Sequence, residues 1–131
     1  MKDFRKLKVW EKSHKLTLWI YTLTKEFPRD ELYGLTNQMR RSSASIPSNI
    51  AEGCGRDSQA ELTRFFKLAM GSSSELEYQL ILAHDLNYID EKAYQDFLSE
   101  LSEFRRMLNA FIQKLKHDHL QEISQKLKAN G

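Results

Sequence analysis

The chain has 131 residues, 40% hydrophobic and 29% charged, with a net charge of +2, which is typical of one globular domain. Five glycines and two prolines are too few for a loop-rich β-sandwich, and a single cysteine excludes an intramolecular disulfide and favours a reducing compartment. No apolar run approaches the roughly 20 residues that span a bilayer, and the basic start lacks the apolar stretch of a secretory signal, so we expect a cytoplasmic protein without a membrane partner.

The first predicted helix runs from about Leu7 to Phe27, where apolar residues recur at helical spacing. Pro28 should end this helix, because proline disfavours helical geometry in the residue before it. One apolar seam follows the helix, and Val9, Trp10 and Trp19 widen it; the seam consists of Leu16, Ile20, Leu23 and Phe27.

The second predicted helix runs from near Asp30 to Gly53 and contains Gly34 and Pro47. Pro47 removes one backbone hydrogen bond, so the helix should kink near Ser43. The alternative is a break there, which gives two shorter helices. Small residues fill the positions between the apolar ones, and this pattern predicts a tightly packed, partly polar inner helix; the small residues are Ser42, Ser43, Ala44, Ser45 and Ser48.

The third predicted helix has the clearest start in the chain, since Ser58 and Glu61 have the spacing of a capping box. It should end near Leu86 or Asn87. Its apolar seam consists of Leu62, Phe65, Phe66, Ala69, Ser72 or Ser73, Leu76, Leu80 and Ala83.

The fourth predicted helix starts after Asp90, a favourable N-cap residue. Its seam alternates steps of three and four residues, the heptad period of a left-handed bundle. The pattern fails after Leu115, so residues 1–115 are predicted to form the bundle and residues 116–131 a helical extension or a flexible tail. The seam consists of Tyr94, Phe97, Leu101, Phe104, Leu108, Phe111 and Leu115.

Short connections favour antiparallel neighbours, so we predict an all-α, up-down-up-down four-helix bundle with a kinked second helix. The turn from Cys54 to Asp57 sets a register in which residues of the second and third helices whose numbers sum to roughly 111 lie level. Ser42 should then face Ala69. In this register, Arg40 or Arg41 could also reach Glu75.

Several motifs of the chain are informative when taken together. They are Phe4, Leu7, Val9 and Trp10; Phe27-Pro28; Glu31 with Tyr33-Gly34-Leu35; Gln38-Met39-Arg40-Arg41; Ser45-Ile46-Pro47-Ser48-Asn49-Ile50-Ala51-Glu52-Gly53; Arg56; Arg64-Phe65; and Ala69, Gly71-Ser72 and Glu75-Leu76. These motifs resemble those of a known family, the four-helix-bundle proteins encoded in intervening sequences of bacterial 23S ribosomal RNA genes, and the resemblance covers roughly residues 4–115. It implies a ring-shaped homo-oligomer, typically a pentamer, and relatives that include the accessory variability proteins of diversity-generating retroelements, which bind nucleic acid and a reverse transcriptase.

Two groups of basic residues suggest that the chain binds RNA or DNA. Repeated around a ring, each group would contact several phosphates, and binding would weaken with salt. No helix-turn-helix, RNA-recognition or zinc-finger pattern is present, so sequence-specific recognition is not expected. The first group is Lys2, Arg5, Lys6, Lys8, Lys12 and Lys15; the second, near the hairpin of the second and third helices, is Arg40, Arg41, Arg56, Arg64 and Lys67. The structural alternative is a solvated helix face with one or two ion pairs.

A protein-interaction scaffold or adaptor that binds no nucleic acid is the alternative function. Aromatic residues are enriched at protein interfaces, and the chain has more of them than the four inner seams accommodate. The surplus, which suits self-association or a protein partner, consists of Trp10, Trp19, Tyr21, Tyr33, Tyr78 and Tyr88.

An enzyme is not expected, and neither is a cofactor. No histidine has the spacing of a triad with a serine, and Cys54 lies between two glycines in a turn. His117 and His119 point apart on a helix, so they would share a metal only if the tail were extended. The four histidines are His14, His84, His117 and His119.

Overall fold

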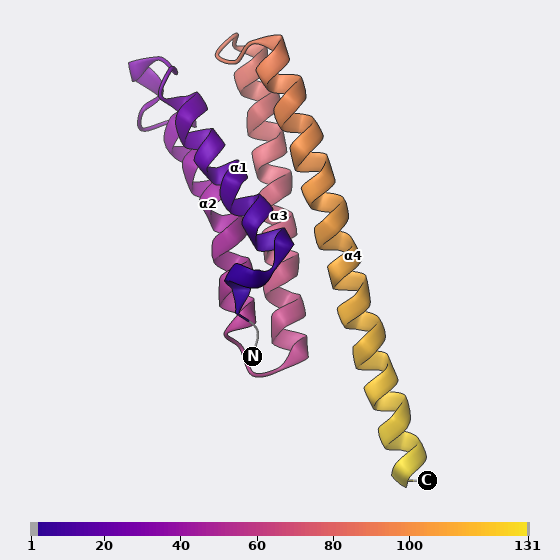
Figure 1. Ribbon diagram of the computed structural model, residues 1–131. Helices are drawn as coiled ribbons and strands as arrows, with labels where there is room; N and C mark the ends of the chain where they lie inside the picture. Colours follow the sequence, from indigo (N-terminus) through magenta and orange to yellow (C-terminus); the bar gives the residue numbers. More distant parts are fainter. Residues whose placement is uncertain (1–2, 131) are drawn as a thin grey trace.

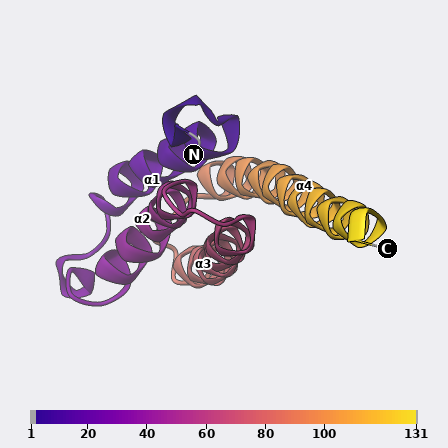
Figure 2. The ribbon, with the colours of Figure 1, turned by 90° about the horizontal axis from the view of Figure 1, so that it is seen from below.

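A computed structural model of the protein describes residues 3–130 and shows the predicted antiparallel four-helix bundle, with no β-strand in that range (Figure 1). Viewed along the bundle, α2 lies between α1 and α3 (Figure 2). The helices are α1 (Lys8–Thr24), α2 (Leu35–Cys54), α3 (Gln59–Asp85) and α4 (Glu91–Asn130), and two short 3-10 helices, η1 (Phe4–Lys6) and η2 (Arg29–Glu31), precede α1 and α2.

The first helix ends earlier than its apolar pattern predicts. It stops at Thr24, and the next residues form tighter i to i+3 hydrogen bonds, in which the N–H groups of Glu26 and Phe27 donate to the carbonyls of Leu23 and Thr24. Phe27 still lies in the core, because the tightened turn carries its ring inward against Tyr88, with 5.3 Å between the ring centroids.

The predicted start of the second helix at Asp30 is wrong. Asp30 lies in η2, and α2 begins at Leu35 with Gly34 as its N-cap, outside the helix. The Glu31 carboxylate accepts from the Leu35 N–H (3.2 Å) and from the Tyr88 hydroxyl (2.9 Å), so it caps α2 and ties it to the α3–α4 connection. A Cβ atom at Gly34 would lie 2.8 Å from Glu31 Oε1, so a side chain at this position would displace the capping carboxylate.

We expect the Glu31→Ala substitution to lower the free energy of unfolding by about 1–2 kcal/mol, because it removes a helix cap and the acceptor of a tyrosine hydroxyl. Urea denaturation followed by circular dichroism measures this change. Asp30→Ala is the matched control, since Asp30 is exposed and accepts no hydrogen bond from a side chain among residues 3–130. Equal losses in the two variants would contradict the capping role.

Pro47 lies inside an unbroken α2, so the alternative of two shorter helices is wrong. Proline has no N–H, and the carbonyl of Ser43, four residues earlier, loses its helical donor. The Thr17 hydroxyl of α1 donates to this carbonyl at 2.9 Å in a buried position. A side chain from the neighbouring helix thus satisfies the group that the proline leaves unpaired, which allows the helix to continue.

The serine-bearing face of α2 packs inward, as its sequence predicts. Ser42 and Ser43 are buried, and the Ser42 hydroxyl donates to Gln79 Oε1 of α3 at 2.5 Å. The expected pairing of Ser42 with Ala69 is wrong, since the hydroxyls of Ser45 and Ser72 lie 2.8 Å apart and set a register in which level residue numbers sum to about 117 rather than 111. Side chains lean toward the N-terminus of their own helix, so in an antiparallel pair each α2 residue meets an α3 residue farther from the turn than a count of backbone rises indicates.

The N-cap residues predicted for α3 and α4, Ser58 and Asp90, cap these helices in the structure. The Ser58 hydroxyl accepts from the Glu61 N–H (3.1 Å), and the Asp90 carboxylate accepts from the Ala93 N–H (2.8 Å). Glu61 binds Arg64 through its side chain, and its predicted return bond to Ser58 is not among the hydrogen bonds of the structure. The largest fully buried side chains of these helices come from the predicted seams: Phe66, Leu76, Leu80, Phe97, Leu101, Phe104 and Leu108.

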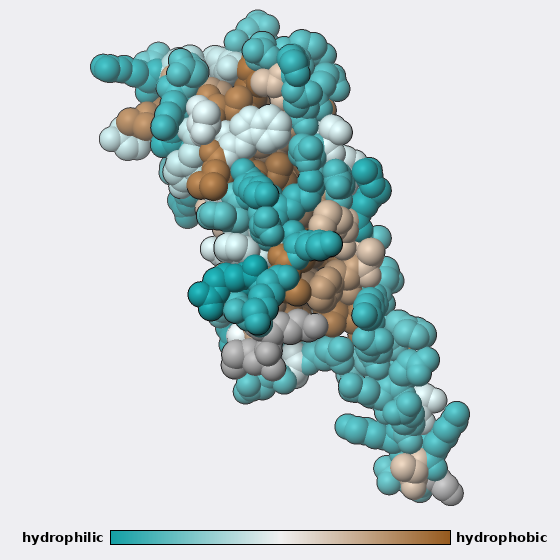
Figure 3. Space-filling view, in the orientation of Figure 1, coloured by the Kyte–Doolittle hydropathy of each residue, from teal (hydrophilic) through white to brown (hydrophobic). Residues whose placement is uncertain are grey.

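The part of α4 beyond Leu115 remains helical but leaves the bundle. It projects beyond the α2–α3 turn (Figure 1), and hydrophilic residues cover most of its surface on the face shown in Figure 3. Three apolar side chains on it are exposed to solvent: Leu120, Ile123 and Leu127. Among residues 3–130, no helix combines the length and apolar character needed to cross a membrane.

Candidate nucleic-acid interface

The α2–α3 turn brings two of the predicted basic residues close together. Gly55 caps α2, and the Arg56 N–H donates to the Gly53 carbonyl at 3.1 Å, which directs the chain back toward α3. The two helices approach closely here, since a Cβ atom at Gly53 would lie 3.0 Å from Phe65 Cβ. Glycine at this position therefore lets Phe65 pack directly against α2.

Arg56 and Arg64 both lie over the Phe65 ring. Their guanidinium carbons are 4.9 Å and 4.5 Å from the ring centroid. Stacking of this kind orients a guanidinium while leaving its edge in water. The turn thus presents two positioned arginine forks, a suitable arrangement for phosphate oxygens.

Each of these arginines also binds a carboxylate on its own helical segment. Arg56 donates to Glu52 at 2.5 Å, and Arg64 forms a two-bond pair with Glu61 at 2.8 Å and 3.3 Å. The hydrogen bond from Arg64 lowers the pKa of Glu61, and the same bond raises the pKa of Arg64. Both pairs are exposed, so they contribute little to stability and a phosphate can replace either carboxylate.

The lowered pKa of Glu61 predicts a small acid sensitivity. A carboxyl whose pKa falls on folding stabilises the fold above its unfolded pKa, near 4.5, and this stabilisation is lost as the pH falls through the folded value. We expect the urea midpoint of a Glu61→Gln variant to decline less between roughly pH 5 and pH 3 than that of the unmodified protein. Glu122→Gln is the control, because Glu122 has no ion-pair partner among residues 3–130. If the urea midpoints of Glu61→Gln and of the unmodified protein decline equally with falling pH, the acid sensitivity does not come from Glu61.

Further exposed lysines surround this end of the bundle. Lys67 follows Arg64 along α3, Lys114 of α4 lines the same groove as Arg56, and Lys6 belongs to η1, which packs against α2. The N-terminal segment lies beside the α2–α3 turn (Figure 1). We call this set the basic end; its residues are Lys6, Arg56, Arg64, Lys67 and Lys114.

Arg40 and Arg41 do not join the basic end. They lie on α2, about 15 residues before Arg56, which corresponds to roughly 22 Å along a helix. Arg40 donates to the Thr24 hydroxyl (2.9 Å) and lies 4.8 Å from the centroid of the Tyr21 ring, so it packs on α1. Arg41 is exposed, and the expected pairing of either arginine with Glu75 is not found among residues 3–130. The predicted five-residue group is therefore two separate surfaces.

The N-terminal basic group is largely engaged in ion pairs. Lys12 binds Glu100 and Glu103 of α4, Lys15 binds Glu11 at 3.1 Å, and Arg5 binds Asp3 at 3.1 Å. Lys2 lies outside the described residues. Lys6 and Lys8 thus remain as exposed cations of this group without an ion pair in residues 3–130.

A groove of about 520 Å³ lies at the basic end, between the α2–α3 turn and α4. Leu62, Phe111 and Leu115 give it an apolar floor, and Arg56 and Lys114 lie on its rim. Its rim also carries acidic groups, from Asp57, Asp118 and Glu122. With three acidic groups against two cations around it, the groove itself does not favour an anion.

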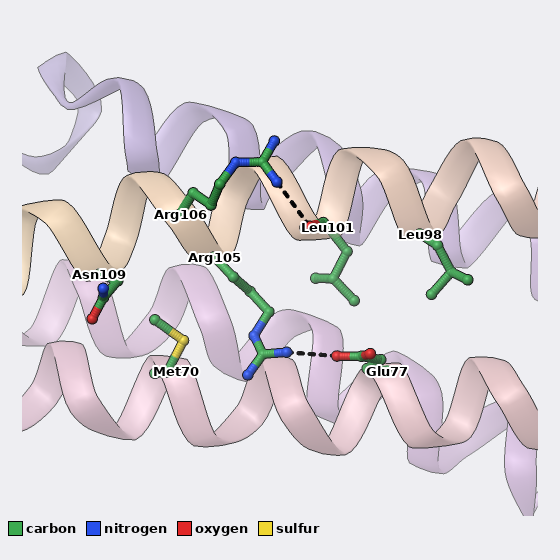
Figure 4. Close-up of a pocket in the computed structure, with 8 residues that line it drawn as sticks. Met70, Glu77, Leu98, Leu101, Arg105, Arg106 and Asn109 are labelled. Carbon is green, nitrogen blue, oxygen red and sulfur yellow. Dashed lines mark hydrogen bonds and ion pairs between the residues drawn. The ribbon is translucent and has the colours of Figure 1, made fainter.

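A second groove, of about 570 Å³, lies between α3 and α4 (Figure 4). Arg105 points across it to Glu77 (2.6 Å) and Ser74 (3.0 Å), and its buried Nε has no hydrogen-bond partner in the described part of the chain. Arg106 bonds Ser102 on its own helix at 3.0 Å. Arg105 and Arg106 were not among the basic residues predicted to bind nucleic acid, although they are adjacent in the sequence, as Arg40 and Arg41 are. The Arg105–Glu77 pair is less exposed than the ion pairs of Arg56 and Arg64, so a phosphate displaces its carboxylate less readily, and this groove is a weaker phosphate site than the basic end.

The remaining chemical candidates from the sequence are a metal cluster, the histidines and Cys54. Within residues 3–130, no three histidine, cysteine or acidic side chains could hold a metal ion. His84 stacks on Tyr94 and bonds Glu91 at 2.5 Å, which helps to lower the pKa of Glu91 after the larger effect of Gln95. Cys54 is buried beneath the α2–α3 turn.

Comparison with known proteins identifies a family and solved structures of the same fold. The model of the 23S rRNA-intervening sequence protein family matches residues 5–110. A crystal structure from Bacteroides thetaiotaomicron, described as a protein of unknown function from the S23 ribosomal protein family, superposes with a TM-score of 0.74 and 24% sequence identity, over 80% of this chain and 95% of that chain. At this identity the likeness shows the fold alone. No curated protein matches the chain.

Proposed function

The chain belongs to the 23S rRNA-intervening sequence protein family, and from this premise we propose that it is a cytoplasmic, self-associating bundle whose basic end binds the backbone of RNA or DNA. The family name records where the genes lie and assigns no activity. The protein acts by binding, without a cofactor and without catalysis. The ring, a pentamer, is what the family resemblance implies.

The paired arginines over Phe65 are the observation that carries this proposal. They are oriented before any ligand arrives, so binding a phosphate costs little side-chain entropy. Lys6, Lys67 and Lys114 extend the positive surface around them. Contacts of this kind go to the phosphate backbone, which gives strong salt dependence and little sequence preference.

Self-association multiplies the effect of each basic end. A ring presents several copies of the same patch to one strand, and each further contact forms at high effective concentration. A moderately basic surface on one chain thereby becomes a useful binding surface on the assembly.

A protein-interaction scaffold is the second candidate, and the exposed aromatics favour it. Tyr33 is 92% exposed and Tyr78 is 62% exposed. Large exposed rings are common at protein interfaces. A scaffold of this kind would bind no nucleic acid at low salt.

We expect fluorescence anisotropy to detect binding of a strand of about 30 nucleotides of RNA or DNA at low salt, with affinity that falls steeply as KCl rises. The Arg56→Gln, Arg64→Gln double variant should bind at least about tenfold more weakly at equal salt, and its slope of log affinity against log salt should be smaller by about two. The matched control is Lys25→Gln, Lys92→Gln, which removes the same charge at the opposite end of the bundle and should leave the slope nearly unchanged.

Two results would contradict the nucleic-acid function. The first is no retention of either strand at low salt, which would leave the scaffold as the function. The second is an equal loss of affinity in the two double variants, which would mean that net charge and not the basic end controls binding.

A further inference from the structure

Two exposed surfaces on opposite sides of α2 differ in character: one carries a projecting tyrosine and an arginine, and the other an open glycine and a glutamate. The first, the corner surface, lies where α1 runs into α2 and consists of Tyr21, Leu32, Tyr33 and Arg41. The second, the α3 face, lies on the outer side of α3 and consists of Leu68, Gly71, Glu75 and Tyr78. All eight residues are exposed, and α1 and α3 lie on opposite sides of α2 (Figure 2).

The corner surface projects and is basic. Leu32 and Tyr33 stand out from the connection between η2 and α2, and nearly the whole Tyr33 side chain lies in water, since the residue is 92% exposed. Arg41 adds a positive charge, and it has no ion-pair partner within residues 3–130. Tyrosine and arginine are among the residues enriched at the energetically important positions of protein interfaces.

The α3 face is hollowed at its centre and acidic. Gly71 lies on it between Leu68 and Tyr78, and a Cβ atom at Gly71 would meet nothing within 4 Å. A glycine in an exposed helix interior costs stability, so its open position marks a place where another surface can approach the backbone. Within residues 3–130, Glu75 accepts only from Gln79 on its own helix, at 3.3 Å, and has no ion-pair partner.

We propose that the corner surface of one copy docks on the α3 face of a second copy, with Tyr33 over Gly71 and Arg41 paired with Glu75. This inference rests on the self-association proposed above and assigns its surfaces. The pairing of Arg41 with Glu75, predicted from the sequence to lie within one chain, would thereby form between two chains. Since the two surfaces differ, the contact is heterologous, and its repetition closes into a ring if the angle between subunits permits.

Gly71→Trp tests the contact by steric exclusion. The space around Gly71 is open, so the substitution leaves the bundle intact and blocks only an approaching subunit. Light scattering should give a multiple of 15.4 kDa for the unmodified protein and 15.4 kDa for Gly71→Trp. The control is Gln121→Trp, which places the same ring on the projecting end of α4 and should keep the assembled mass. Far-UV circular dichroism checks that both variants retain their helices.

Charge exchange tests the pairing of the two surfaces. Arg41→Glu and Glu75→Arg should each raise the dissociation constant of the assembly at least about tenfold in sedimentation experiments, because each places like charges across the contact. The two substitutions together should restore it to within about threefold of the unmodified protein, because the pair is re-formed with its charges reversed.

The outcomes separate this inference from the function on which it rests. An unmodified protein that runs as a monomer at micromolar concentration overturns both. A Gly71→Trp variant that remains assembled overturns the assignment of these surfaces and leaves self-association standing. The same holds if the double variant Arg41→Glu, Glu75→Arg has a higher dissociation constant than either single variant.

Discussion

We expect the Phe66→Ala variant to lose about 3–5 kcal/mol of unfolding free energy, because truncating a buried phenylalanine removes its burial energy and leaves a cavity. Phe66 is fully buried in the α3 seam, and its ring lies 5.2 Å from that of Phe111 on α4, so it joins two helices. Urea denaturation measures the change, since small domains usually unfold in one transition.

A matched truncation on the same molecule provides the control. Leu127 lies on the projecting end of α4 and is 71% exposed. Leu127→Ala should therefore change the unfolding free energy by less than about 0.5 kcal/mol. Similar losses in the two variants would mean that Phe66 does not lie in a rigid core.

The Ser42→Leu variant should lose about 2–4 kcal/mol, since overpacking a filled core and leaving a buried acceptor unpaired each cost about 1–3 kcal/mol. Ser42 is only 5% exposed and donates to Gln79 Oε1, which is itself buried. A leucine at this position would separate α2 from α3 and would remove that donor. The same denaturation experiment gives the loss.

Ser48→Leu distinguishes the inner face of α2 from the outer one. Ser48 is on the same helix, and the substitution is chemically identical, but its side chain is exposed. We expect a change below about 0.5 kcal/mol at this position. A larger loss for Ser48→Leu than for Ser42→Leu would reverse the assigned orientation of α2.

Features that depend on local chemistry could be predicted from the sequence. Ser58 and Asp90 start α3 and α4 because their side chains accept from backbone N–H groups three residues ahead. The heptad spacing that follows Asp90 gives the buried seam of α4 with two differences, since Tyr94 and Phe111 are only partly buried, and Ile112 is buried in addition.

Features that depend on distant partners could not be predicted. The start of α2 is set by Glu31, whose carboxylate is also held by Tyr88, 57 residues later in the chain. Likewise, α2 continues past Pro47 because Thr17 of another helix bonds the Ser43 carbonyl. Neither contact has a signal in the local sequence.

The projecting end of α4 shows what a hydrophobic pattern does and does not predict. The end of the seam at Leu115 correctly predicts the loss of burial beyond it. The end of the seam does not mean that the helix ends there, because leucine, lysine, glutamine and glutamate favour helical backbone even without packing.

The candidate site could be predicted only in part from the sequence. Arg56 and Arg64 could be paired across a short turn, and the fold brings them to one phenylalanine ring. Arg40 and Arg41 share only their basic character with that pair, and the length of α2 separates the two pairs. At about 1.5 Å of rise per helical residue, Arg40 and Arg41 lie too far along α2 from Arg56 and Arg64 for the four arginines to form one surface.

Hydrogen–deuterium exchange with and without a bound oligonucleotide tests most directly whether nucleic acid binds at the basic end. At low salt, the amides around the α2–α3 turn, from Gly53 to Glu61, should exchange more slowly in the complex, together with those of α4 near Lys114. Amides at the opposite end of the bundle, around Asp30 and Asp90, should be unchanged. Protection at that opposite end, with none at the α2–α3 turn, would contradict the account.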